Sequence, residues 1–440
     1  MQVKQIVHPE SPSTGVAVST KLPTITPSWR GWLIWSLSAS AFGYAFFQRV
    51  TPGVMVSDLM RDFAIGGGML GVLSALYFYP YFLLQVPLGA LLDRLGARLL
   101  LSVAVFLAGL GSFVFGAAES LAVAYAGRIL IGVGSAVGFL GSMSLAARWF
   151  PPQRFAFLTG LAMFLAMMSG VLGQGPLAVF VEAYGWRTSQ WALGIFGVVL
   201  ALLIFVVVRD APPSDRQTAP RDIQPWSDVW RGLRKAASLW NTWKIALVAG
   251  AMSGPMLVLG GLWGVPYFMQ AYQLDRPQAA YLVSLLLFGW AIGAPASGWL
   301  SDRLHKRKAI VVCGLGVLTA TLGAVALLPV PPLAVSTGLF ILAGFSGAAM
   351  VPTFALVRET SEASIAGSVS GIVNALTVAS GALLQPLVGV VLDVVWDGAV
   401  VDGSRIYQPE NFQTAFTILF LTALGGLLVS LTLRESPHPT

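Results

Sequence analysis

Charged residues are scarce in this chain of 440 residues: only 10% are Asp, Glu, Lys or Arg, whereas 56% are hydrophobic. A water-soluble domain carries roughly a quarter charged residues, so this composition excludes a soluble globular protein. Apolar runs recur along the chain, and a run of about 20 residues is long enough to cross a bilayer as a helix. The surplus apolar side chains are therefore expected to face lipid.

Cysteine, histidine and catalytic patterns are also nearly absent. The single cysteine, Cys313, excludes an intramolecular disulfide, and the three histidines (His8, His305, His438) lie outside the apolar runs. The sequence has no metal-ligand cluster, no phosphate-binding glycine loop and no nucleophile elbow, which argues against an enzyme. We expect no cofactor, and a coupling ion, proton or sodium, stays unassigned. The net charge of +7 lies mostly in short loops and indicates topology, not a nucleic-acid partner.

Twelve apolar runs fall into two sets of six. They predict an all-α membrane protein of twelve transmembrane helices in two pseudo-symmetric six-helix bundles. The runs lie near 31–55, 69–92, 99–118, 121–145, 154–180, 188–208, 245–271, 278–301, 309–329, 332–355, 364–393 and 412–433. The predicted parts are an N-terminal tail (1–30), a first bundle (31–208), a linker with an amphipathic segment (209–244), a second bundle (245–433) and a C-terminal tail (434–440).

The basic residues predict the orientation of the spans. Of 26 Lys and Arg, twenty fall on the side that holds both termini and the linker, and two lie inside spans. The other four are Arg61, Arg187, Arg276 and Arg405. By the positive-inside rule, both termini and the linker are cytoplasmic, which predicts a multi-pass protein of the cytoplasmic (inner) membrane. Within the linker, tryptophans alternate with basic residues from 226 to 243, which indicates an amphipathic helix on the bilayer surface.

The two halves repeat one another. Gly89-Ala-Leu-Leu-Asp-Arg-Leu-Gly-Ala-Arg98 recurs 209 residues later as Gly298-Trp-Leu-Ser-Asp-Arg-Leu-His-Lys-Arg307. Farther along, Ser169-Gly170 is matched by Ser380-Gly381. Parallel repeats of this kind are typical of transporters, in which the binding site forms between the halves.

The repeated loop resembles the signature of the major facilitator superfamily, and Gly127-Arg128-Ile-Leu-Ile-Gly-Val-Gly134 resembles the fourth-helix motif of that family. The loop side chains are placed to bind helix ends or acidic partners, and thereby to hold the cytoplasmic side closed and then release it. The alternative is that they only set topology and turns. The residues predicted to take part in gating are Asp93, Arg94, Arg98, Asp302, Arg303 and Arg307, with Arg148 and Arg358 as partners of the two aspartates.

Two arginines, Arg49 and Arg128, lie inside spans. An arginine at the centre of a span costs roughly 2.5–3.5 kcal/mol on insertion scales, so it needs a partner. The deep parts of the spans hold no Asp, Glu or His. We therefore predict that the counter-charge is the cargo, since a guanidinium matches a carboxylate or phosphate bidentately. Alternatively, Arg128 bonds backbone carbonyls of the first span and Arg49 reaches toward the outer surface.

A closer resemblance is to the anion:cation symporters of that superfamily, which carry organic acids with protons. It rests on Phe46-Phe47-Gln48-Arg49, on Tyr81 with Gln85-Val-Pro87, and on Gly371-Ile-Val-Asn374. It implies that Arg49, Arg128, Tyr81 and Asn374 contact the substrate, and that Gln48 belongs to the same site. Gln48 and Ser135 stand where the resembled group has acids. No deep carboxylate is thus available as a proton relay, and exchange, facilitated passage and export stay open.

The seventh span contains Gly260-Gly-Leu-Trp263-Gly-Val-Pro-Tyr267, which predicts a hinge with Trp263 and Tyr267 lining the cavity. The alternative is an aromatic belt at the membrane interface. Together these features predict a secondary transporter that moves a small organic anion and acts as a monomer. Two other interpretations are a carrier of amino acids or other zwitterions and an exporter of amphiphilic compounds.

Overall fold

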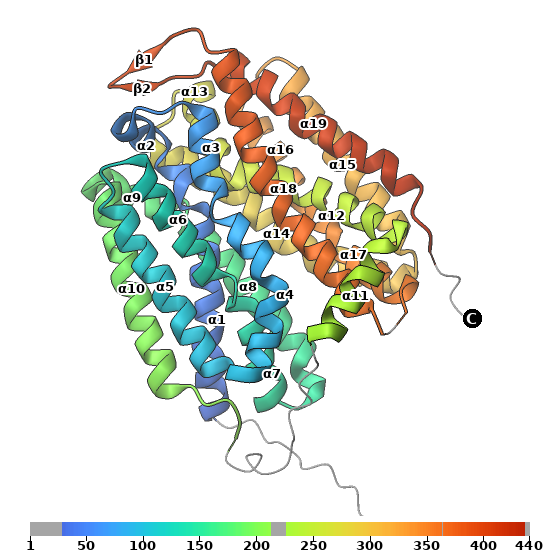
Figure 1. Cartoon of the computed structure of the whole chain (residues 1–440). Helices are drawn as coiled ribbons and strands as arrows, with labels where there is room; N and C mark the ends of the chain where they lie inside the picture. The colour runs from blue at the N-terminus through green and yellow to red at the C-terminus, as the bar shows by residue number, and fades with distance from the viewer. Residues whose placement is uncertain (1–28, 213–225, 363, 436–440) are drawn as a thin grey trace, which may run out of the picture.

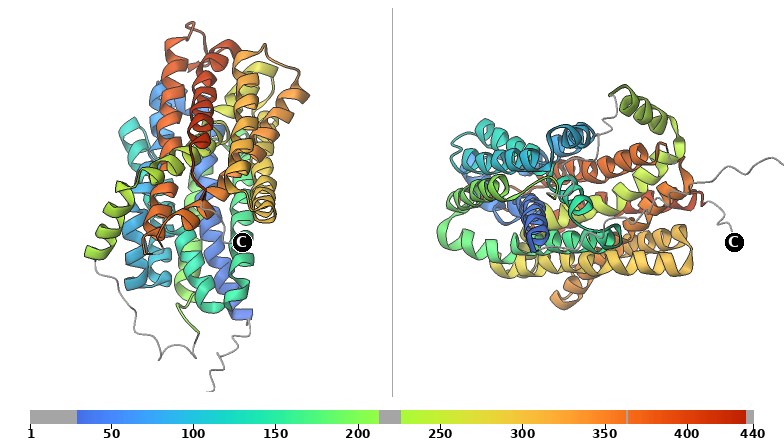
Figure 2. Two further views of the ribbon diagram at one scale, coloured as in Figure 1. Left: turned by 90° about the vertical axis from the view of Figure 1, so that its right-hand side faces the viewer. Right: turned by 90° about the horizontal axis from the view of Figure 1, so that it is seen from below.

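The computed structural model describes residues 29–212, 226–362 and 364–435, and these form two helical bundles that lie side by side (Figures 1 and 2). The predicted N-terminal tail, apart from its last two residues, lies outside the described residues. So do 213–225 of the predicted linker and 436–440 of the C-terminal tail.

The N-terminal half consists of six spans, three of which are built from two helices each. They are α1 (Trp29–Val50); α3 (Gly67–Ala75) with α4 (Phe78–Leu95); α5 (Ala97–Gly116); α6 (Leu121–Ser135) with α7 (Gly138–Trp149); α8 (Phe155–Leu172) with α9 (Gly175–Tyr184); and α10 (Trp186–Val207). The short elements η1 (Thr51–Val54), α2 (Val56–Phe63) and η2 (Pro152–Arg154) connect them.

The C-terminal half follows α11 (Trp226–Ser238) and repeats this plan. Its spans are α12 (Trp240–Val258), the π-helical turn η4 (Leu259–Trp263) and α13 (Gly264–Tyr272); α14 (Arg276–Leu304); α15 (Arg307–Leu327); α16 (Leu333–Gly347), η5 (Ala348–Met350) and α17 (Val351–Thr360); α18 (Ala366–Val394); and α19 (Pro409–Leu431). A two-stranded hairpin of β1 (Val400–Val401) and β2 (Ser404–Arg405) precedes α19.

The predicted fold class is confirmed. Eleven segments of the described chain are long and apolar enough to cross a membrane. With α1, which has 22 residues, they make the twelve spans expected from the sequence. The observed bounds lie within five residues of those predicted. The chain is thus a multi-pass, all-α membrane protein.

The bundle has two distinct ends, which Figure 1 shows at the top and the bottom. We call the end that carries α2 and the β1–β2 hairpin the hairpin end. We call the opposite end, where α1 begins and α11 lies, the loop end. In the helix α11, Ala236 is buried, whereas Trp230 is 63% exposed. The helix is fixed to the C-terminal half by an ion pair between Lys235 and Glu362 (2.6 Å). Its placement on the bilayer surface stays a prediction.

Candidate functional site

One carboxylate joins the two halves at the hairpin end. Asp393, at the end of α18, accepts hydrogen bonds from the backbone N–H groups of Gly67 and Gly68, both at 2.8 Å. These amides open α3 and have no partner within their own helix, and the helix dipole favours a negative charge there. Arg405 (3.0 Å) and the Tyr407 hydroxyl (2.6 Å) also bind Asp393. Asp393 of the C-terminal half therefore caps a helix of the N-terminal half.

Tyr407 strengthens this contact. Burial raises the pKa of its phenol, and the hydrogen bond to Asp393 raises that pKa further. The hydroxyl therefore stays protonated and donates to the carboxylate, while its oxygen accepts from the Gly67 N–H at 2.9 Å. The phenol thus bridges the two halves at the same point.

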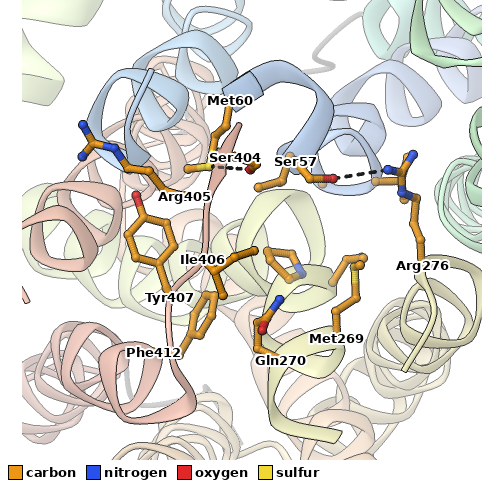
Figure 3. Close-up of a pocket in the computed structure, with 15 residues that line it drawn as sticks. Ser57, Met60, Met269, Gln270, Arg276, Ser404, Arg405, Ile406, Tyr407 and Phe412 are labelled. Atoms are coloured by element: carbon orange, nitrogen blue, oxygen red, sulfur yellow. Dashed lines mark hydrogen bonds between the residues drawn. The ribbon is translucent and has the colours of Figure 1, made fainter. Parts of the chain in front are cut away.

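An ion pair also crosses between the halves nearby. Asp58 of α2 pairs with Arg276 of α14 at 2.8 Å, and Arg276 also donates to the Ser57 hydroxyl at 3.2 Å. A small pocket lies beside this pair, between η1 and α2 on one side and α13 and the chain leading into α19 on the other (Figure 3). Arg276 and Arg405, the two arginines that line the pocket, are both held by aspartates of the contacts described above.

Glycines bring the halves into direct backbone contact at the hairpin end. A Cβ added to Gly389 of α18 would lie 2.1 Å from the carbonyl oxygen of Gly67, and one added to Gly71 of α3 would lie 2.5 Å from the Cα of Pro386. Toward the loop end, Cβ atoms on Gly89 of α4 and Gly371 of α18 would meet nothing within 4 Å. In the described residues, α3 and α18 are therefore interlocked at the hairpin end, whereas these two glycines make no close contact toward the loop end.

The π-helical turn in the seventh span is held from both sides by two buried glutamines. Gln174 of the N-terminal half donates to the Gly260 carbonyl, and Gln385 of the C-terminal half donates to the Leu257 carbonyl at 2.8 Å. The two glutamines lie 211 residues apart, within two residues of the register of the repeated loop, so each occupies an equivalent place in its half. The predicted irregularity of this span is therefore present as a π turn, and it lies at the contact between the halves.

Arg128 is completely buried, with 0% of its surface exposed. Its two terminal nitrogens donate to the carbonyls of Gln48 (3.1 Å) and Ser74 (3.3 Å). These carbonyls belong to the last turns of α1 and α3, where the helix dipole is negative. The Gln48 carbonyl also accepts from the Thr51 hydroxyl, and the Ser74 carbonyl from the Tyr77 N–H. Carbonyl dipoles of the protein thus stabilise the Arg128 guanidinium, as in the alternative weighed from the sequence. A direct contact of Arg128 with substrate stays a prediction.

Arg49, in the last turn of α1, has a different environment. Its guanidinium lies 4.2 Å from the ring centre of Phe46 and 5.3, 5.7 and 5.8 Å from those of Tyr81, Tyr77 and Phe78. Its Nε has no hydrogen-bond partner, and no carboxylate of the described residues forms an ion pair with it. Aromatic faces attract a cation but leave its charge uncompensated. Arg49 is therefore a cation inside the membrane-spanning part that still needs an anion.

The neighbours of Arg49 are neutral and polar. The Tyr81 hydroxyl interacts with Arg49 and with Gln85, which lies one turn farther along α4. The Gln85 side-chain oxygen in turn accepts from Asn374 of α18 at 2.6 Å. Three of the predicted site residues, Arg49, Tyr81 and Asn374, are thus linked in one chain of contacts. Gln85, which in the sequence is only part of a motif, completes this chain and joins the two halves through Asn374.

Three other predicted site residues lie away from this region. Gln48 is fully buried inside the N-terminal half and donates to Tyr44 (2.9 Å) and Ser112 (2.6 Å). Trp263 and Tyr267 are also 0% exposed. Trp263 donates to the Gln385 backbone carbonyl at 3.1 Å, and Tyr267 packs among phenylalanines of the C-terminal half. In this conformation none of the three lines an open space, and their contact with substrate stays a prediction.

In the first repeated loop, Arg98 contacts other residues of its own half. Arg98 donates from its Nε to the Phe205 carbonyl at the end of α10 (2.8 Å), and its backbone N–H donates to Asp210 (3.0 Å). Arg98 thus binds a helix end, as predicted for these arginines. Arg94 is exposed, Arg148 is half-buried, and the side chain of Asp93 lies outside the described residues. The pairing predicted for Asp93 with Arg148 stays a prediction.

The second repeated loop has a different pairing from the one predicted. Asp302 pairs with Arg307, not with Arg358, which is exposed. Arg307 also donates to Glu359 at 3.0 Å and to Ser301 at 2.9 Å, because the turn after α14 places it between α14 and α17. Arg303 lies over the Trp299 ring, 5.2 Å from its centre. The part these residues play in gating stays a prediction.

The sequence as a whole is related to known transporters. A model of the Major Facilitator Superfamily matches residues 37–386 and 265–439. The chain belongs to the Major Facilitator Superfamily. This membership makes it a secondary transporter and not an enzyme.

Curated relatives and solved structures agree with this family. The "Probable sulfoacetate transporter SauU" of Cupriavidus necator is 24% identical over 60% of this chain and 63% of its own length. The "Probable nitrate/nitrite antiporter NarK1" of Thermus thermophilus is 26% identical over 65% of this chain and 66% of its own length. Each match thus spans less than two thirds of the relative. A bacterial homologue of the human lysosomal transporter Spinster has the same fold, with a TM-score of 0.76 at 15% identity over 94% of this chain and 100% of its own.

Proposed function

We propose that this protein carries a small organic anion across the cytoplasmic membrane, with Arg49 as the residue that binds the anionic group. The observation that carries the proposal is the uncompensated guanidinium of Arg49 among aromatic and neutral polar side chains. Relatives named for sulfoacetate and for nitrate or nitrite support an anionic substrate. Counterflow in proteoliposomes against carboxylates, sulfonates and amino acids tests it. Uptake restricted to uncharged solutes or to amphiphilic cations contradicts it.

The asymmetry of the contacts between the halves supports transport by alternating access. We take the hairpin end as the outer side and the loop end as the cytoplasmic side, in keeping with the distribution of basic residues. The structure then corresponds to a state closed to the outside, in which Asp393, Arg276 and the glycines of α3 and α18 form the seal. Transport requires this seal to open while the loop end closes.

We expect wild-type uptake to be indifferent to an imposed pH gradient and Gln48→Glu to make it pH-dependent. Gln48 is neutral, and it donates to two hydroxyl groups, those of Tyr44 and Ser112. A carboxylate at this position can accept from the same two hydroxyls once they turn from the Leu193 and Ala108 carbonyls, to which they donate in the parent. It would supply a deep acid where none exists. The measurement is uptake of the best counterflow substrate with the exterior at pH 5.5, 6.5 or 7.5. Uptake by the variant should rise as the exterior becomes more acidic.

The matched control is Gln190→Glu, because Gln190 is equally buried in the same half but contacts Met55 toward the hairpin end. It should leave uptake independent of pH. If an inward proton gradient strongly accelerated uptake by the wild-type protein, the expectation that its uptake is independent of a pH gradient would be wrong.

We expect Asp393→Asn to shift the protein toward opening at the hairpin end. The amide keeps one acceptor oxygen but loses the charge that faces the α3 N-terminus, a loss of roughly 1–3 kcal/mol, or about 5- to 150-fold in the equilibrium. A cysteine in place of Val265, which is 2% exposed and lines the pocket, reports the opening in a Cys313→Ser background. Maleimide labelling of the detergent-solubilised protein should accelerate.

Asp397→Asn is the control, since Asp397 only accepts from the nearby Ala399 N–H on the surface. It should leave the labelling rate of the Val265 cysteine unchanged. Equal labelling rates for Asp393→Asn and the parent would show that Asp393 does not hold the seal.

A further inference from the structure

The number of positive charges in the candidate site limits the charge of the anion that the site can bind. Both arginines of the membrane interior were expected to bind cargo, but only one of them is available. Both arginines lack a carboxylate partner among the described residues, and the Nε of each has no hydrogen-bond partner. Arg128 is fully buried and its two terminal nitrogens donate to carbonyls at helix ends, whereas Arg49 is 8% exposed and lies among aromatic rings. Arg49 is therefore the interior guanidinium that is left to contact the cargo directly.

The groups next to Arg49 add hydrogen bonds but no second charge. Tyr81, Gln85 and Asn374 are neutral, and they extend from Arg49 across to α18. The other Lys and Arg of the described chain lie at span ends or in loops, and the acids Asp58 and Asp393 already neutralise Arg276 and Arg405 at the hairpin end. A substrate bound at Arg49 thus meets one cation, aromatic faces and two amide side chains.

We propose that the site selects monovalent anions, with one carboxylate or sulfonate on Arg49 and an uncharged polar group on Gln85 and Asn374. This inference rests on the proposed function and narrows its substrate class. During translocation the site has to close toward both sides, so a second ionised group cannot remain in bulk water. A buried charge without a partner carries a large desolvation cost, whereas an amide or hydroxyl is satisfied by the Gln85 and Asn374 side chains.

The test compares anions of equal shape that differ by one charge. The pairs are succinate and succinamate, tartrate and its monoamide, and sulfoacetate and sulfoacetamide, each tested in counterflow with proteoliposomes at pH 7.5. For the pair that is taken up fastest, we expect the monoamide to exceed the dianion at least about tenfold, equivalent to 1.4 kcal/mol. This uptake should be lost in the Arg49→Gln variant. The part of the uptake that is lost is the part that passes through this site.

A gain-of-function variant provides a second readout. Asn374→Lys places a cation where the proposal assigns the uncharged end of the substrate, and Gln85→Lys does the same from α4. Either variant that keeps the thermal stability of the parent should reduce the preference for the monoamide at least about tenfold, or reverse it.

The outcomes separate the two claims. Arg49-dependent uptake in which the dianion equals or exceeds its monoamide overturns the selection of monovalent anions and leaves the anion carrier in place. The absence of Arg49-dependent uptake for every anion overturns the proposed function, and this inference with it.

Discussion

Arg49→Gln should abolish anion uptake while leaving the protein folded. The variant removes the interior guanidinium that has no carboxylate partner in the described chain and, unlike Arg128, is not bonded to carbonyls at two helix ends. Loss of one partner from a desolvated charge pair costs roughly 2–5 kcal/mol, so binding of the anion should weaken by about 30- to 5000-fold. Glutamine keeps much of the aliphatic volume between Phe46 and Tyr81, and the cation–π contacts that it removes are worth roughly 0.5–2 kcal/mol, so the loss of stability should be small. The measurements are counterflow uptake and the Tm of the purified protein.

Arg128→Gln is the matched control, and in this variant we expect the main effect on the stability of the fold. Its guanidinium donates to two carbonyls at helix ends, and hydrogen bonds from charged donors are worth roughly 1.5–3 kcal/mol each. The Tm should therefore fall, on the order of 5 °C. Full retention of uptake in Arg49→Gln, or a loss of Tm in that variant as large as in Arg128→Gln, would contradict the assignment of Arg49 to the substrate.

Gly389→Val should stop transport by preventing closure of the hairpin end. A Cβ at this position would lie 2.1 Å from the Gly67 carbonyl oxygen, and that neighbour is backbone, which cannot rotate away. The two halves must separate to admit the side chain, which is the arrangement expected of the outward-open state. Uptake should fall about 5- to 150-fold, since overpacking at a close contact costs roughly 1–3 kcal/mol. The cysteine at Val265 should become reactive toward maleimide.

The control is Gly338→Val in α16, where an added Cβ meets nothing within 4 Å. It should change neither uptake nor labelling. If the Gly389→Val protein transports at the rate of the parent, transport does not require the hairpin end to close through the contact between Gly389 and Gly67.

The spans could be predicted from sequence because the bilayer imposes a length and an apolar composition on every crossing segment. Their interruptions could not. The first span was predicted to run to residue 55, but α1 ends at Val50 and a 3₁₀ turn with Pro52 follows. The place where a helix ends decides which carbonyls are left unpaired. For this reason sequence alone left two alternatives for Arg128, and the ends of α1 and α3 identify its partners.

The candidate site was predicted in part. Arg49, Tyr81 and Asn374 were found because charge and hydrogen-bonding groups inside apolar runs are rare. Asp393 was recognised only as an acid at a span end, because its partners are backbone amides 326 and 325 residues away. Backbone groups carry no sequence signal of their own. Gln174 and Gln385 did have a signal, their equivalent positions in the two halves, but neutral side chains are common enough that position alone assigns no role.

The duplicated halves differ in how the first turns of their second spans are capped. At the start of α14, Asp275 accepts from the Gln278 N–H and so caps its own helix (2.7 Å). At the equivalent start of α3, Gly66 offers no side chain, and the cap comes from Asp393 of the other half. When the halves part, α14 keeps its cap and α3 loses it. The empty carrier should therefore rest with its hairpin end shut, and the first amides of α3 should exchange their hydrogens with water only as often as that end opens.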